Sequence, residues 1–114
     1  MTRILIVDDD RNLLRVLVRA LEQPGWEVVG VKSIAAARAA GDAWDAVVAD
    51  VGLPNGDGRV LRAVWPDVPF LLISGAPVDE PDEVRLNTVP FLPKPFSVGQ
   101  LRAAVQRLLP ERAP

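Results

Sequence analysis

The sequence predicts an α/β fold in which helices cover both faces of a parallel β-sheet. Two observations support this prediction: short apolar runs alternate with segments of helical periodicity, and the clearest runs are apolar at every position. Strands that are apolar throughout are typical of sheets buried on both sides. At 114 residues, with 49% hydrophobic and 25% charged residues, the chain has the length and composition of one globular domain.

The first half of the chain alternates three expected strands with two expected helices. Leu13, Leu17 and Leu21 recur at four-residue spacing, which is typical of the apolar stripe of a helix that ends before Pro24. Gly41 suits the C-terminal cap of the second, alanine-rich helix. In order, the strands and helices are expected at residues 4–7, 13–21, 26–31, 34–40 and 46–49.

The second half continues with a short helix, two strands and a last helix. Pro90 and Pro93 mark the fifth strand as an edge strand, because proline cannot donate to a central ladder. Ser97 opens the last helix, and Gln100 three positions later completes a capping box. The first three elements are expected at 59–64, 70–73 and 89–92, and the last helix ends before Pro110.

Five strands in about 110 residues match the flavodoxin-like fold, a (βα)5 doubly wound five-stranded parallel sheet with strand order 2-1-3-4-5. Prolines within 76–81 oppose helix formation, so we expect a shortened or absent fourth helix, confined at most to 82–87. Ligands of such sheets bind at the carboxyl ends of strands, where the strand order reverses. The reversal lies between the first and third strands, which end at Asp8 and Asp50.

The same edge of the expected sheet collects the residues that can carry chemistry. Asp8, Asp9 and Asp50 would repel one another there, and a hard divalent cation such as Mg²⁺ relieves that repulsion. Ser74 follows the fourth strand and Lys94 follows the fifth, so a hydroxyl and an ammonium group join the carboxylates. This set suits a phosphoryl group, with Asp50 as a candidate nucleophile.

Four separated motifs give the chain a family resemblance. It resembles the receiver domain of bacterial two-component response regulators, the CheY-like superfamily, in ILIVDDD at 4–10, VADVGLPNGDG at 48–58, LISG at 72–75 and KPF at 94–96. The resemblance implies a receiver domain at 1–110 and a tail or linker at 111–114. It also implies a phosphorylated signalling domain that assists its own phosphotransfer and autodephosphorylation, rather than an enzyme.

The resemblance assigns a role to each candidate residue. Asp50 would accept a phosphoryl group from a phosphohistidine of a sensor histidine kinase or a histidine phosphotransfer protein. Asp9 would ligate Mg²⁺ directly and Asp8 partly through water, with the Gly52 carbonyl as a further ligand. Lys94 would pair with a phosphoryl oxygen.

The resemblance also implies a switch, in which Ser74 moves to the phosphoryl group and Phe91 swings inward. Phe91 lacks a hydroxyl, so a switch there works by packing, and a static core role for it is an even alternative. A cis peptide is implied between Lys94 and Pro95. The small Gly52, two residues after Asp50, departs from most members of the family.

Plainer interpretations apply to several of these residues. Asp10 fits an N-terminal helix cap, and Asp57 fits a turn. Taken alone, Ser74 fits a turn and Lys94 fits a solvent-exposed surface position. Their placement at the same edge of the expected sheet favours a site instead. Two other functions compete with phosphorylation: a pseudo-receiver that is never phosphorylated, and a phosphatase that turns over through an aspartyl-phosphate. The phosphatase is less favoured, because Gly52 rather than an acid stands two residues after Asp50, and no insertion is long enough for a cap.

Composition narrows the function further. The chain has no Cys and no His, which excludes thiolate and imidazole chemistry. A net charge of -2 argues against non-specific nucleic-acid binding. No apolar run approaches the roughly 18 residues of a membrane span, and the N-terminus enters a strand at once. We therefore expect a cytoplasmic protein without a signal peptide or membrane insertion, as a monomer or weak dimer.

Overall fold

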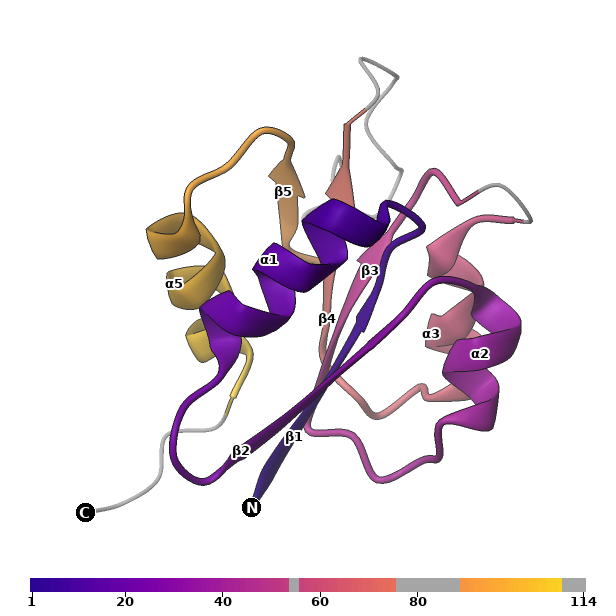
Figure 1. Cartoon of the computed structure of the whole chain (residues 1–114). Helices are drawn as coiled ribbons and strands as arrows, with labels where there is room; N and C mark the ends of the chain where they lie inside the picture. Colours follow the sequence, from indigo (N-terminus) through magenta and orange to yellow (C-terminus); the bar gives the residue numbers. More distant parts are fainter. Residues whose placement is uncertain (54–55, 76–88, 110–114) are drawn as a thin grey trace.

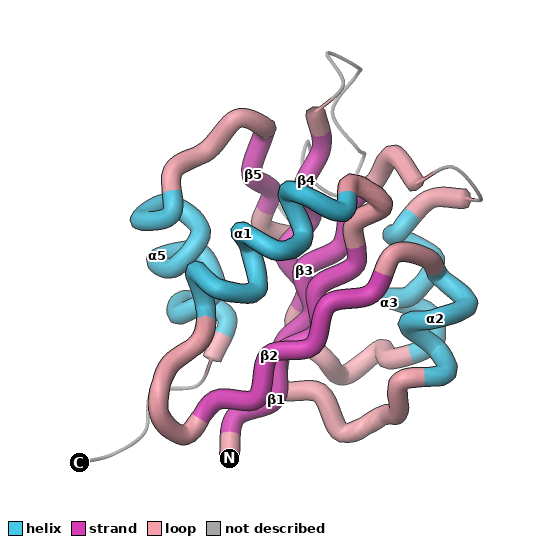
Figure 2. The backbone as a smooth tube through the Cα atoms, viewed as in Figure 1, coloured by secondary structure: helices cyan, strands magenta, loops and turns pink. Residues whose placement is uncertain are grey.

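The computed structural model describes residues 1–53, 56–75 and 89–109 (Figures 1 and 2). The strands are β1 (Thr2–Val7), β2 (Trp26–Val31), β3 (Ala46–Asp50), β4 (Phe70–Ser74) and β5 (Phe91–Pro93). The helices are α1 (Arg11–Leu21), α2 (Ile34–Ala39), α3 (Leu61–Val64), which follows the 3₁₀ turn η1 (Gly58–Val60), and α5 (Val98–Leu108).

The strands form one parallel sheet in the order β2-β1-β3-β4-β5. Helices α1 and α5 cover one face of the sheet, and α2 and α3 cover the other (Figure 1). The predicted doubly wound α/β fold and its strand order are therefore confirmed. The expected shortening of a fourth helix falls on residues 76–88, outside the described residues.

Two strands begin two residues away from their predicted starts. β1 begins at Thr2 rather than residue 4, where the Thr2 N–H donates to the Gly25 carbonyl at 2.8 Å. β5 begins at Phe91 rather than residue 89. Pro90 has no N–H to donate, and its carbonyl accepts a hydrogen bond from the Leu72 N–H at 3.0 Å. Proline therefore shortens the edge strand at its start.

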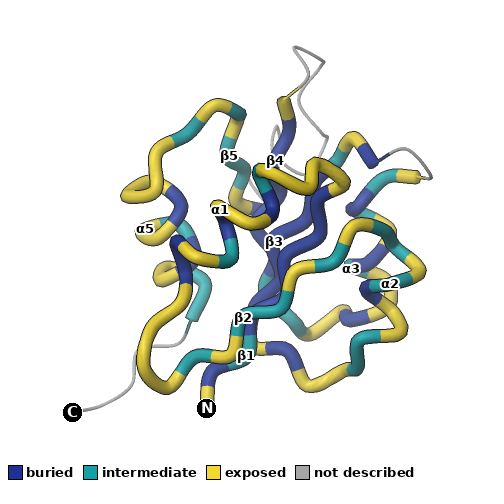
Figure 3. Tube along the Cα trace, in the orientation of Figure 1, coloured by how far each residue is buried: buried dark blue, intermediate teal, exposed yellow. Residues whose placement is uncertain are grey.

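Alternate residues of the central strands fill the two sides of the core. Ile4 and Ile6 of β1 point toward α1 and α5, where they pack with Leu17 and Leu101 in one cluster. Leu5 and Val7 pack with Leu61, Trp65 and their neighbours on the side of α2 and α3. β3 is buried along its whole length (Figure 3). This rigid centre fixes where the ends of β1 and β3 lie.

Side-chain caps define the helix starts as the sequence predicts. The Asp10 carboxylate accepts from the N–H groups of Asn12 at 3.0 Å and Leu13 at 3.1 Å, which confirms its capping role. The Ser97 and Gln100 side chains form the expected capping box of α5. Gly41 adopts a φ of +116° directly after the C-cap of α2, a conformation that favours glycine. Within the described residues, no helix is long and apolar enough to span a membrane.

Candidate functional site

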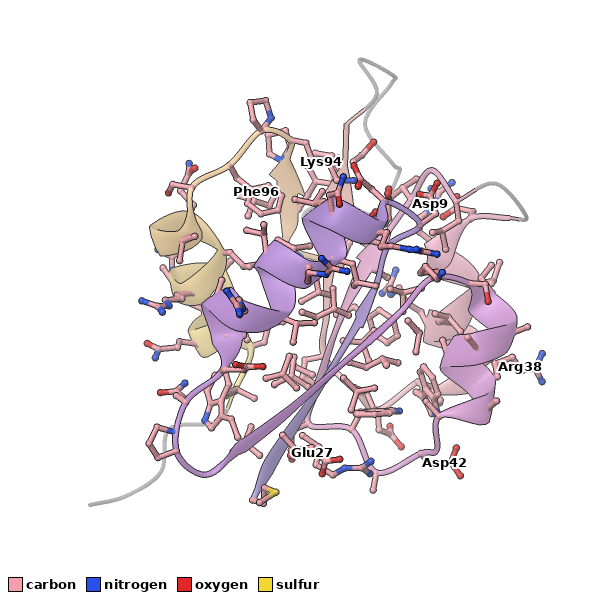
Figure 4. All side chains as sticks on the ribbon, viewed as in Figure 1. Asp9, Glu27, Arg38, Asp42, Lys94 and Phe96 are labelled. Carbon is pink, nitrogen blue, oxygen red and sulfur yellow. The ribbon has the colours of Figure 1, made fainter. Side chains whose placement is uncertain are left out.

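Three carboxylates from distant parts of the chain meet at the carboxyl end of the sheet. Asp8 and Asp9 directly follow β1, and Asp50 is the last residue of β3, the strand next to β1. One carboxylate oxygen from each lies within 4.8 Å of the others. Figure 4 shows Asp9 and Lys94 at this end of the molecule, with Glu27 at the opposite end. The predicted meeting of these acids is confirmed.

The three acids differ in burial and in their backbone contacts. Asp8 is fully buried and Asp50 is 5% exposed, whereas Asp9 is exposed to solvent. The Asp10 N–H donates to Asp8 Oδ1 at 2.9 Å, and the Gly52 N–H donates to Asp50 Oδ1 at 2.9 Å. These bonds fix one oxygen of each buried carboxylate and leave the other facing the cluster.

Lys94 supplies the positive charge inside this acidic cluster. Its Nζ donates to Asp8 Oδ2 at 2.8 Å and to Asp50 Oδ2 at 3.0 Å. The Lys94 N–H donates to the Ser74 carbonyl at 2.8 Å, which anchors its backbone beside the end of β4. The peptide bond between Lys94 and Pro95 is cis, as the resemblance implies. One ammonium group therefore joins the ends of β1 and β3.

The electrostatics of the cluster follow from burial and pairing. Burial raises the pKa of the Asp8 carboxyl above its usual value, and hydrogen bonds from Lys94 and Asp10 oppose this rise without cancelling it. Burial lowers the pKa of Lys94, but its hydrogen bonds to Asp8 and Asp50 outweigh burial, so the pKa lies above its usual value. The ammonium is thus held in its charged form.

The two expected switch residues lie in neighbouring strands, β4 and β5. Ser74 is 6% exposed and ends β4, one residue beyond Ile73, the β-partner of Asp50. Phe91 begins β5, pairs with Leu72 in β4 and is half-buried against the core on the α2 and α3 side. Their roles in a switch stay predictions.

Two glycines that shape the site are not singled out by the sequence. A Cβ atom on Gly58 would lie 2.3 Å from the backbone oxygen of Asp50, so η1 approaches the end of β3 more closely than any side chain allows. A Cβ atom on Gly75 would lie 3.3 Å from Cδ of Lys94. The bare backbone of Gly75 therefore leaves room for the aliphatic part of Lys94. The available signals are that Gly75 directly follows Ser74, the last residue of β4, and that Gly58 ends the motif at 48–58.

The donor set of the cluster fits a magnesium ion. Carboxylate oxygens are the protein ligands that Mg²⁺ prefers, and it keeps several waters, which an exposed Asp9 permits. The repulsion among three carboxylates is only partly offset by Lys94. The structure shows the carboxylate cluster itself; Gly52 is placed beside it by its N–H bond to Asp50.

Fold and site define a doubly wound α/β domain with an acidic cluster at the switch point of its sheet. Residues 4–106 match the response regulator receiver domain family. The chain belongs to this family, whose members are signalling domains.

Named relatives agree with this assignment. The chain is 34% identical to the sensor kinase CckA of Brucella abortus, over 93% of this chain and 12% of that protein. It is 35% identical to the KDP operon transcriptional regulatory protein KdpE of Escherichia coli, over 93% of this chain and 50% of that protein. The chain thus spans half or less of the length of these two relatives.

Solved structures show the same fold. A sensor protein from Polaromonas sp. JS666 superposes with a TM-score of 0.76 and 29% identity, over 94% of each chain. The response regulator TrrA of Thermotoga maritima, solved in complex with Mg²⁺-BeF, gives a TM-score of 0.79 and 25% identity, over 96% of this chain and 100% of that one.

Proposed function

We propose that this domain is a phosphoacceptor in a two-component or phosphorelay system. Asp50 takes a phosphoryl group from a phosphohistidine of a sensor histidine kinase or histidine phosphotransfer protein, and the phosphorylated domain changes its partner binding. The observation that supports this most is the Lys94 ammonium shared between Asp8 and Asp50 within a cluster of three carboxylates. A cation placed against a carboxylate is suited to a phosphoryl oxygen once that carboxylate is modified.

The proposed transfer needs little covalent chemistry from the protein. An Asp50 carboxylate oxygen attacks phosphorus, the phosphorus–nitrogen bond of the donor breaks, and the imidazole leaves with the electron pair and takes up a proton. The Gly52 N–H orients the Asp50 carboxylate through its bond to Oδ1. Lys94 stays close enough to pair with an oxygen of the transferred group. Positioning and charge therefore account for the reaction.

The metal belongs to the same proposal. Asp8, Asp9 and Asp50 would hold Mg²⁺, with the Gly52 carbonyl as a further ligand. Bound there, Mg²⁺ would neutralise negative charge that develops on the phosphoryl oxygens. TrrA, the relative solved with Mg²⁺-BeF, supports a metal and phosphoryl site in this fold at 25% identity.

In this proposal, phosphorylation of Asp50 changes the domain through the positions of Ser74 and Phe91. Acyl phosphate on Asp50 adds about two negative charges, which can shift a local equilibrium by a few kcal/mol. Ser74 would hydrogen-bond the phosphoryl group, and Phe91 would change its packing beside Leu72. The domain works without direct nucleic-acid binding or membrane insertion, and the proposal places it in the cytoplasm, where ATP charges the donor.

The competing functions are separated by one incubation. The protein is mixed with Mg²⁺ and acetyl phosphate, and the adduct is followed by intact-mass spectrometry. We expect one base-labile phosphoryl group per chain that is absent from Asp50→Asn and retained in Asp67→Asn, an exposed acid outside the cluster. No adduct would favour the pseudo-receiver, and many turnovers without a lasting adduct would favour the phosphatase.

A further inference from the structure

The side chain of Lys94 crosses the end of one strand to reach the acidic cluster. Lys94 directly follows β5, the edge strand, whereas Asp50 ends β3 and Asp8 follows β1. Strand β4 lies between β5 and β3, and neighbouring strands are about 4.8 Å apart. The four-carbon stem of Lys94 therefore passes over the carboxyl end of β4 before its Nζ meets the two carboxylates. Gly75 directly follows β4, so it lies at this crossing point.

Two atoms of the Lys94 stem come close to the backbone of Gly75. A Cβ atom on Gly75 would lie 3.3 Å from Lys94 Cδ and 3.7 Å from Lys94 Cβ. The shorter distance is tighter than the best van der Waals separation of two carbon atoms, which is about 3.5 to 4.0 Å. The stem therefore lies against bare backbone, in space that any other residue would partly fill.

The conformation of the backbone does not explain a glycine at position 75. Within the described residues, the glycines with positive φ angles are Gly25, Gly41 and Gly56. Gly75 is outside this set, and it is exposed, so burial does not exclude a larger residue there. Gly52, which also borders the cluster, has room for a Cβ atom at 3.7 Å from Asp50 Oδ1. The contact with Lys94 is thus what sets Gly75 apart.

The Lys94 side chain is held at both ends, which limits how far it can move aside. At its root, the Lys94 N–H donates to the Ser74 carbonyl at 2.8 Å. At its tip, Nζ donates to Asp8 Oδ2 at 2.8 Å and to Asp50 Oδ2 at 3.0 Å. A side chain at position 75 would push the stem between these two fixed points. The displacement would therefore reach Nζ and lengthen its hydrogen bonds.

We propose that Gly75 is a positioning residue, whose missing side chain keeps the Lys94 ammonium on both Asp8 and Asp50, where the ammonium then meets the transferred phosphoryl group. The second half of this statement rests on the proposed function, whereas the placement of the ammonium does not depend on phosphorylation. A charged group assists a reaction when it is held where charge develops, and a small misplacement costs a large factor in rate. A larger residue at position 75 should therefore slow the phosphorylation of Asp50.

Nuclear magnetic resonance of the lysine ammonium groups tests the placement. The chain has two lysines, Lys32 and Lys94, so Lys32→Met assigns the signals of a ¹⁵N-labelled sample in EDTA. The hydrogen bonds of Lys94 to two carboxylates slow the exchange of its ammonium protons with water. We expect this exchange to be at least about tenfold faster in Gly75→Val, with an intermediate rate in Gly75→Ala.

The rate of phosphorylation tests the consequence for the reaction. With acetyl phosphate and saturating Mg²⁺, we expect Asp50 to gain the phosphoryl group at least about tenfold more slowly in Gly75→Val. The matched control is Gly99→Val, because Gly99 is exposed in α5 and its Cβ atom would meet Ser97 Oγ at an ordinary 3.8 Å. Both the exchange rate and the phosphorylation rate should be unchanged in this control. Circular dichroism checks that the variants are folded, and Gly75→Ala serves in both measurements if Gly75→Val is not.

The two measurements separate the possible outcomes. The proposal is overturned if the Lys94 ammonium protons exchange equally fast in Gly75→Val and the unchanged chain, because the chain after β4 has then moved in place of the lysine. It is also overturned if exchange accelerates without slower phosphorylation, or if Gly99→Val behaves like Gly75→Val. If the unchanged chain gains no phosphoryl group, the proposed function fails, and the ammonium exchange alone decides whether Gly75 positions Lys94.

Discussion

Lys94 Nζ lies 2.8 Å from Asp8 Oδ2 and 3.0 Å from Asp50 Oδ2, so one ammonium group joins carboxylates that are 42 positions apart in the sequence. Asp8 is fully buried, and only 19% of the Lys94 side chain is exposed. The pair is therefore shielded from solvent far more than a surface salt bridge. Its role in stability and its role in the proposed chemistry can be tested separately.

Removing the ammonium should destabilise the metal-free protein. Lys94→Met leaves the buried Asp8 carboxylate without its counter-charge, which should cost about 3 to 5 kcal/mol of unfolding free energy. Denaturant titration in the presence of EDTA measures this change. Lys32→Met is the matched control, because Lys32 is exposed and makes no ion pair in the described structure. Equal stability of the two variants would contradict the claim that the ion pair between Lys94 and Asp8 stabilises the fold.

The ion pairs of Lys94 with Asp8 and Asp50 should also make the folding stability fall at alkaline pH. The pKa of Lys94 is raised above 10.5, so its stabilising contribution is complete below that pH and is lost as the pH rises through the folded-state pKa. The chain has no Tyr and no Cys, so no phenol or thiol titrates in this range. Thermal unfolding of metal-free protein should show a fall in stability above pH 10.5 that Lys94→Met lacks.

Gly58 should be intolerant of any side chain. The Cβ atom of Gly58→Ala would lie 2.3 Å from the Asp50 carbonyl oxygen, so η1 or the end of β3 must move. We expect a loss of about 2 to 3 kcal/mol in thermal or denaturant unfolding. Gly52→Ala is the control, since its Cβ atom would meet Asp50 Oδ1 at an ordinary 3.7 Å. Comparable losses in both variants would argue against the close approach as the cause.

Magnesium should stabilise the folded domain through Asp9. At a Mg²⁺ concentration ten times the Kd, binding to the folded state alone adds about 1.4 kcal/mol. Asp9→Asn removes one exposed carboxylate from the cluster and should abolish most of this gain, whereas Asp67→Asn should retain it. Calorimetric unfolding with and without Mg²⁺ measures the difference. A gain that survives Asp9→Asn would place the metal elsewhere.

The sequence predicts the meeting of Asp8, Asp9 and Asp50. The apolar runs predict a parallel sheet, and the acids that follow two of these runs mark the edge of the sheet where ligands bind. The cap at Asp10 is predictable for a similar local reason, since one side chain and two nearby N–H groups form it. The direct bond from Lys94 to two carboxylates depends on three strand ends at once, and no local pattern encodes it.

Other features depend on distances that only the folded chain reveals. The close approach of Gly58 to the Asp50 backbone, and of Gly75 to the Lys94 side chain, arise from packing between elements. A glycine after a turn or strand is equally consistent with a simple turn. The predicted start of β5 lies two residues early, because the apolar Val89 fits a strand pattern although the following Pro90 delays the ladder.

The central claim is that Asp50 carries the phosphoryl group, and chemical trapping tests it most directly. The protein is incubated with Mg²⁺ and acetyl phosphate, reduced with borohydride, which converts an aspartyl phosphate to homoserine, and mapped by peptide mass spectrometry. We predict reduction at position 50, dependent on Mg²⁺ and on the phosphodonor. Trapping at Asp8 or Asp9 in its place, or no trapping at any aspartate, would contradict the account.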